Sequence, residues 1–220
     1  MLLLLLLLLL LLLLRVVCLA FQAKGERSYH AFYQLLAGAA ADSRLRAELA
    51  LEGGAASFTY AVAGGTVDAA GVDDGADFGS MMDALHNLGL DMGRQQAVLR
   101  VIGAVLHLGN VTFVPVSEME EGAAVSAEGA DVLDEVVRLL GVDTEALTSA
   151  LTSKNIGSRS IILVPFTLEQ AENARDALAK ALYVRSLAVD DKCFIVLLLT
   201  HDYSSTCFPL TSLLYLFVNS

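Results

Sequence analysis

The chain has 220 residues, of which 55% are hydrophobic and 18% are charged, and its formal net charge is −11. This length allows one domain or two small ones, and the acidic balance argues against a general nucleic-acid-binding protein, because no basic stripe is available to displace counterions from phosphates. Three cysteines are present, at Cys18, Cys193 and Cys207, and they are too few and too scattered for a disulfide framework or a zinc site, which favours a reducing compartment.

The N-terminal segment 1–14 contains leucine at every position from 2 to 14. As a helix it would extend roughly 20 Å, which is short of the roughly 30 Å hydrocarbon core of a bilayer, and Arg15 interrupts its continuation. Three interpretations stay open: a low-complexity expansion or misassigned gene start, a signal peptide, and a membrane anchor. No basic residue precedes the leucines, which weighs against the signal peptide.

Residues 27–37 are predicted to form a helix that ends at Gly38. Its apolar stripe consists of Tyr29, Phe32, Tyr33 and Leu36. His30 and Gln34 lie off this stripe, and we interpret His30 as a surface or hydrogen-bonded histidine rather than a catalyst.

The segment 57–65, SFTYAVAGG, is predicted to be a short strand ended by Gly64 and Gly65. A second helix follows it, with Gly89 as its terminator. The apolar stripe of this helix consists of Phe78, Met81, Met82, Leu85 and Leu88.

Four aspartates precede or open this second helix, and their density raises the question of calcium. They are Asp68, Asp73, Asp74 and Asp77. Their spacing does not fit a calcium loop with a glutamate at its twelfth position. We therefore interpret them as carboxylates that cap the helix and stabilise its dipole.

The segment 94–116 is predicted to form a helix ended by Gly109 and then a strand in which Pro115 favours an edge. The apolar face of the helix consists of Val98, Val101, Ile102, Val105 and Leu108. The opposite face consists of Gln96, Arg100 and His107. Residues 117–130 are predicted to form a surface loop.

The C-terminal half is predicted to contain helices at 131–140, near Asp143 and from Thr167, with an extended or hairpin segment at 154–166. The 131–140 stripe consists of Val132, Leu133, Val136 and Leu140. Thr167 and Gln170 form a capping box. The helix after it carries an apolar face of Ala171, Ala174, Leu178, Ala181 and Leu182, and a predicted pair between Asp176 and Lys180.

Motifs for catalysis and phosphate binding are missing from the sequence. It has no G-x-S-x-G, H-E-x-x-H, C-x-x-C or G-x-G-x-x-G. A Walker loop needs glycine directly before lysine, and none of the four lysines meets this condition. They are Lys24, Lys154, Lys180 and Lys192. We predict no catalytic, cofactor-binding or metal-binding residue in this chain.

Five blocks, in order, resemble the myosin motor head. They are GERSYHAFYQLLAGA, VDDGADFGSMMDALHNLGL, VIGAVLHLGNVTF, VVRLLGVDTEALTSALTSKNI and PFTLEQAENARDALAKALYVRSL. The second departs from the family pattern at Leu90, where phenylalanine is usual. The resemblance covers residues 15–187 as a partial motor domain, and 188–220 is predicted to be an unrelated hydrophobic tail.

The resemblance implies an α+β, mainly α fold: a helical subdomain with a few strands, part of the P-loop myosin motor head between switch I and switch II, in the upper actin-cleft region. Its strands are expected to join a sheet made elsewhere in the head. It also implies an actin-based, ATP-driven motor that uses ATP and Mg²⁺, with actin filaments as partner and a cytoplasmic, cytoskeletal location.

The phosphate loop and both switches are absent from this sequence, so we expect a truncated or mispredicted product that is inactive as an ATPase by itself. The alternative is a non-catalytic module that binds actin or a partner. A membrane-tethered or secretory-pathway form, held by the leucine run, is a further alternative.

Overall fold

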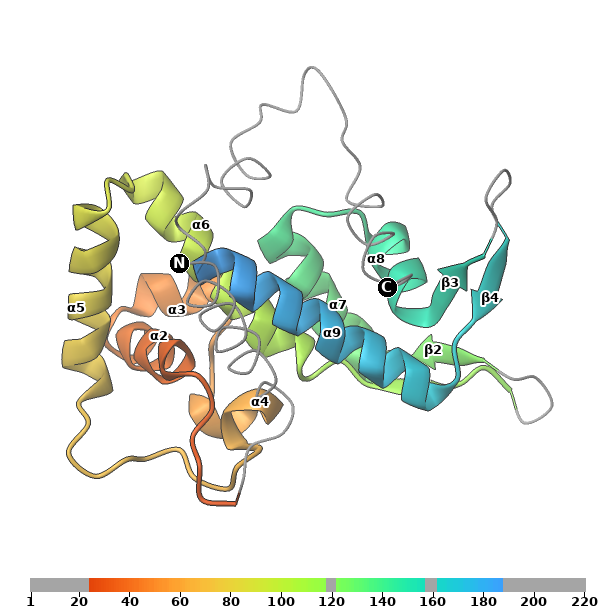
Figure 1. Ribbon diagram of the computed structural model, residues 1–220, viewed down its shortest axis with the longest axis horizontal. Coiled ribbons are helices and arrows are strands. Elements are labelled where there is room, and N and C mark those ends of the chain that lie inside the picture. The colour runs from red at the N-terminus through yellow and green to blue at the C-terminus, as the bar shows by residue number, and fades with distance from the viewer. Residues whose placement is uncertain (1–23, 118–121, 157–161, 188–220) are drawn as a thin grey trace, which may run out of the picture. The chain divides into compact units, whose positions relative to one another are not determined.

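The computed structural model describes residues 24–117, 122–156 and 162–187, the last four of them by backbone alone. The chain divides into two compact units, one ending at Leu88 and the other beginning at Gly89. The described part is mainly helical with a few short strands, as predicted (Figure 1). The leucine run, all three cysteines and the hydrophobic tail lie outside the described residues.

The regular elements of the N-terminal unit, among its described residues, are all helical. They are α2 (His30–Ala41), α3 (Ser43–Leu49), the 3-10 turn η1 (Ala55–Ser57), α4 (Thr59–Val62) and α5 (Asp74–Asn87). Helix α2 provides most of the core, and the Phe32 and Leu35 side chains are fully buried. The predicted stripe is therefore correct at Phe32, Tyr33 and Leu36, but the buried face is wider than predicted.

The prediction that Gly38 ends the first helix was wrong. Gly38 lies inside α2, which continues to Ala41, and Asp42 follows as both the end of α2 and the N-cap of α3. A Cβ atom built on Gly38 would lie 2.5–2.7 Å from three ring carbons of Phe78. Gly38 is therefore a site of close contact with α5, and not a helix terminator.

The predicted strand at 57–65 was also wrong, because this segment forms η1 and α4. Phe58, Tyr60 and Ala61 are all buried. The described part of this unit contains no strand that could pair with the segment, whereas one helical turn satisfies its backbone locally through bonds from Ala61 N and Val62 N to Phe58 O.

The C-terminal unit contains four helices and two hairpins among its described residues. The helices are α6 (Met92–Leu108), α7 (Ala127–Leu140), α8 (Thr144–Thr152) and α9 (Leu168–Leu187). The strands are β1 (Phe113–Pro115), β2 (Ala123–Val125), β3 (Ser153–Asn155) and β4 (Leu163–Pro165). Each described strand has one antiparallel partner within the chain, β1 with β2 and β3 with β4.

Helix α6 is the centre of this unit and packs against α7 and α9 (Figure 1). Residues 101–108 are all buried, so the assignment of His107 to a polar face was wrong, whereas Gln96 and Arg100 are exposed as predicted. Helices α7 and α9 both pack against α6, and a helical segment that is buried on all sides has no solvent face.

The predicted loop at 117–130 instead contains β2 and the first turn of α7. Pro115 stands at a strand edge opposite Ala123, as predicted. Short Gly- and Ala-rich strands carry a weak sequence signal, because their pairing depends on the partner strand and not on their own propensity.

Candidate functional site

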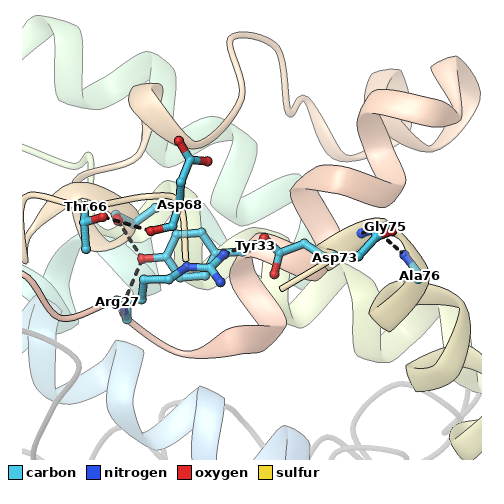
Figure 2. Close-up of polar contacts among 10 residues, drawn as sticks. Arg27, Tyr33, Thr66, Asp68, Asp73, Gly75 and Ala76 are labelled. Atoms are coloured by element: carbon cyan, nitrogen blue, oxygen red, sulfur yellow. Dashed lines mark hydrogen bonds and ion pairs between the residues drawn. The ribbon is translucent and has the colours of Figure 1, made fainter. Parts of the chain in front are cut away.

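A buried polar cluster in the N-terminal unit has Arg27 at its centre. The Arg27 guanidinium lies over the Tyr33 ring (Figure 2). It is 3.8 Å from the ring centroid, and its Nη2 is 2.5 Å from Asp74 Oδ2. The Arg27 side chain is 8% exposed and that of Asp74 is 23% exposed. A cation held both by a carboxylate and by an aromatic face is fixed in one position.

Tyr33 fixes the other side of the cluster. Its hydroxyl donates a hydrogen bond to Ala61 O at 2.7 Å and accepts one from Ser28 N at 2.9 Å. One side chain thereby joins α2, the last turn of α4 and the segment that precedes α2. Through Arg27, the same assembly reaches the first turn of α5.

Asp73 takes the capping role predicted for the four aspartates, and Asp74 and Asp77 lie in the first turn of α5, where carboxylates favour the helix dipole. Asp73 is the N-cap of α5 and its Oδ1 accepts from Gly75 N and Ala76 N, at 3.1 and 3.0 Å (Figure 2). Asp68 accepts a hydrogen bond from Thr66 Oγ1 through its backbone carbonyl oxygen. Among the described residues, no group of three or more His, Cys, Asp or Glu side chains is arranged to hold a metal ion.

In the C-terminal unit, Arg175 on α9 likewise connects distant segments through polar contacts. Its Nη1 donates to Val111 O at 2.9 Å, and its Nε and Nη2 each lie 2.9 Å from Asp176 Oδ1. Asp176 thus pairs with its neighbour Arg175, whereas the sequence predicted Lys180 as its partner. The contact joins α9 to the turn between α6 and β1.

The N-terminal end of α7 also packs closely against the turn between α6 and β1. Ser126 Oγ accepts from Gly129 N at 2.9 Å and lies 2.6 Å from Thr112 Oγ1. A Cβ atom on Gly129 would lie 2.6 Å from Thr112 O, so only glycine fits here without a shift of the backbone.

Sequence reasoning found several helix caps, but it missed the N-caps Asp42, Asp91 and Ser126 and the contacts between distant segments. Asp143 caps α8, and Thr167 and Gln170 form the predicted reciprocal capping box before α9. His30 is exposed on α2, in agreement with its interpretation as a surface residue. The pairing of Arg27 with Asp74 was not predicted. The sequence shows only that each residue lies within a recognisable motif, and nothing in it indicates that the two motifs are in contact.

The described residues do not fit Mg-ATP. Asp73 already serves as the N-cap of α5, and Asp74, the first residue of the helix, is the partner of Arg27. The sequence has no glycine directly before a lysine, so a phosphate loop cannot be drawn.

In the described part of the chain, no helix has the length and apolar character needed to cross a bilayer.

Comparison with known proteins gives a consistent result over most of the chain. The family model described as "Myosin head (motor domain)" matches residues 9–189. Myosin IE heavy chain of Dictyostelium discoideum is 37% identical over 170 residues, which cover 74% of this chain and 17% of that protein. Unconventional myosin-XV of Homo sapiens is 39% identical over 166 residues, which cover 75% of this chain and 5% of that protein.

Unconventional myosin-VI of Mus musculus is 34% identical over 195 residues, covering 75% of this chain and 15% of that protein. The chain thus spans less than a fifth of the length of each of these relatives. The family match extends over more than half of the chain and includes every described helix and hairpin. The chain therefore belongs to the myosin head (motor domain) family and represents part of that head.

Proposed function

We propose that this chain forms the part of an actin-based, ATP-driven motor head that lies between switch I and switch II, in the upper actin-cleft region. The observation that supports the proposal is that sequence blocks resembling the myosin head contact one another in the folded chain. Arg27 of the first block pairs with Asp74 of the second, and Arg175 of the last block holds Val111 of the third.

The proposed role is that of a scaffold within the motor, without catalytic residues of its own. Residues 15–187 are the motor segment in this proposal, and 1–14 and 188–220 are separate additions. ATP and Mg²⁺ would be bound by segments of a longer head, because the described residues offer neither a phosphate loop nor a set of metal ligands. Actin filaments are the proposed partner and the cytoskeleton the proposed location.

The test is a transplant into a relative. Residues 15–187 replace the aligned segment in the head of Dictyostelium discoideum myosin IE, and ATP hydrolysis is measured with and without actin filaments. We expect the chimera to retain hydrolysis that actin stimulates. A control chimera with the same junctions carries the mouse myosin-VI segment, and activity in the control but none in the test chimera would contradict the proposal.

A second experiment addresses the ends of the sequence. The full-length transcript is sequenced across both ends of the reading frame. We expect upstream sequence that encodes a phosphate loop and switch I, and downstream sequence that encodes a D-x-x-G-F-E motif. A message that begins at the leucines and stops after Ser220 would contradict the motor role for this product.

The second candidate function is a non-catalytic module that binds actin or a partner. Full burial of large apolar side chains within each unit favours it, with Phe32 and Leu35 in one unit and Leu106 and Leu108 in the other. A module should melt cooperatively and sediment with actin filaments in the absence of ATP. Purified 220-residue chain that aggregates without a cooperative transition would exclude it.

A further inference from the structure

Helix α5 is the least buried long helix of the described chain. None of its 14 residues is buried, and its apolar stripe of Phe78, Met81, Met82 and Leu85 is half-buried. Leu88, directly after it, is 60% exposed. By contrast, α2 has seven buried residues. A helix with so little buried surface opens at lower cost than its neighbours.

Specific side-chain contacts attach α5 to the rest of its unit at two places. One turn after the start of α5, the Phe78 ring lies against Gly38 of α2. At its N-terminal end, Asp74 pairs with Arg27. Gly71 before the helix and Gly89 after it have φ values of 80° and 83°, so glycine turns flank α5 on both sides.

The two partners of the ion pair are anchored to different elements. Arg27 is held by the Tyr33 ring, and Tyr33 is fixed by hydrogen bonds to Ser28 and Ala61, so the cation is anchored to α2 independently of Asp74. Asp74 moves with α5. Arg27 Nε and Asp74 Oδ1 are buried without a hydrogen-bond partner in the described structure, so the closed pair depends on one strong contact.

We propose that α5 opens as a separate unit of the fold and that the Arg27–Asp74 ion pair controls this opening. Opening hydrates both charges and releases Phe78 from Gly38, while the core formed by α2 stays closed. Loss of the Asp74 charge destabilises the closed state, because Arg27 then lies buried against a neutral group. The proposal does not depend on the motor role.

Hydrogen exchange of the full 220-residue chain, followed by mass spectrometry, tests the proposal. In Asp74→Asn we expect amides of α5 to exchange at least about tenfold faster, with α2 and α6–α9 unchanged. Asp77→Asn is the matched control, because it removes the same charge from the first turn of the same helix without touching Arg27. We expect its effect to be no more than about threefold, as for a helix-dipole contribution.

Leu85→Ala provides a second, independent variant. It weakens the half-buried stripe without changing the ion pair, and it should also accelerate exchange in α5 alone. Three results would overturn the proposal: equal acceleration by Asp74→Asn and Asp77→Asn, joint acceleration of α2 and α5 in Leu85→Ala, or unfolding of the whole N-terminal unit in Asp74→Asn.

Discussion

Tyr33 has a role at the residue scale that its aromatic character alone does not suggest. It belongs to the apolar stripe of α2, yet its hydroxyl is a hydrogen-bonding centre and its ring carries the Arg27 guanidinium. Buried tyrosines usually find a partner for the hydroxyl, and this one finds two. The side chain therefore contributes both packing and orientation.

Tyr33→Phe isolates the contribution of the hydroxyl. The substitution keeps the ring and its contact with Arg27 but leaves Ser28 N and Ala61 O without this partner. We expect the free energy of unfolding to fall by about 1–3 kcal/mol, because buried polar groups lose their hydrogen bonds. Urea unfolding of the full chain measures it, and a change below about 0.5 kcal/mol would show that water replaces the hydroxyl.

Gly38→Ala tests the close contact between α2 and α5. The new Cβ would lie within 2.7 Å of the Phe78 ring, so the ring or the helix must move. We expect a loss of about 1–3 kcal/mol in the free energy of unfolding, measured in urea.

Gly79→Ala is the matched control for this prediction. Gly79 is also a helical glycine, but a Cβ there has no atom within 4 Å. Alanine should therefore stabilise the protein by about 0.5–1 kcal/mol through helix propensity. Stabilisation by both substitutions would refute the close contact at Gly38.

At this scale, the sequence predicts local contacts and misses distant ones. The pair Thr167 and Gln170 is three residues apart, so a motif identifies it. Arg27 and Asp74 are separated by 47 positions and Arg175 and Val111 by 64. Such partners are chosen by the packing of whole helices, and no short pattern specifies them.

At the scale of elements, the N-caps differ in how much the fold depends on them. Ser126 at the start of α7 is buried and also contacts Thr112, whereas Asp143 at the start of α8 is exposed. Both accept one backbone hydrogen bond from the third residue of their helix. The same local motif therefore has different surroundings.

Alanine substitution at the two caps measures this difference. Ser126→Ala should lower the free energy of unfolding by about 1–3 kcal/mol, because Gly129 N then lies buried without its acceptor. Asp143→Ala should cost about 0.5–1 kcal/mol, since water can hydrate the freed N–H. Equal costs in chemical unfolding would mean that burial of the cap is unimportant.

The predicted apolar faces were correct in type but not always in extent. Helix α9 was expected to bury Ala171, Ala174 and Leu178, yet its buried side chains include Ala171, Ala179 and Tyr183. Helix α9 packs against α6 and α8, and its fully buried residues include the small residues Ala171 and Ala179. The direction of the face depends on the neighbouring helices, so periodicity alone places it only approximately.

At the scale of the whole molecule, the described residues account for structure and not for ATP chemistry. The purified 220-residue chain should bind no Mg-ATP at nucleotide concentrations up to about 1 mM, because its sequence contains no phosphate loop to donate hydrogen bonds to the phosphates. Titration calorimetry with and without Mg²⁺ measures this. The myosin IE head serves as the control, and saturable, Mg²⁺-dependent heat from this chain would contradict the prediction.

By itself, the sequence determined the mainly helical class, the order of the longer helices, the caps at Asp73, Asp143 and Thr167, and the resemblance to a motor head. These follow from hydrophobic periodicity, capping residues and motifs, which act over a few residues. The tertiary structure alone decided that Gly38 is a contact, that 57–62 is helical, that His107 is buried, and that Arg27 meets Asp74. Each of these depends on what another segment places nearby, and burial and pairing between distant residues are properties of the packed chain.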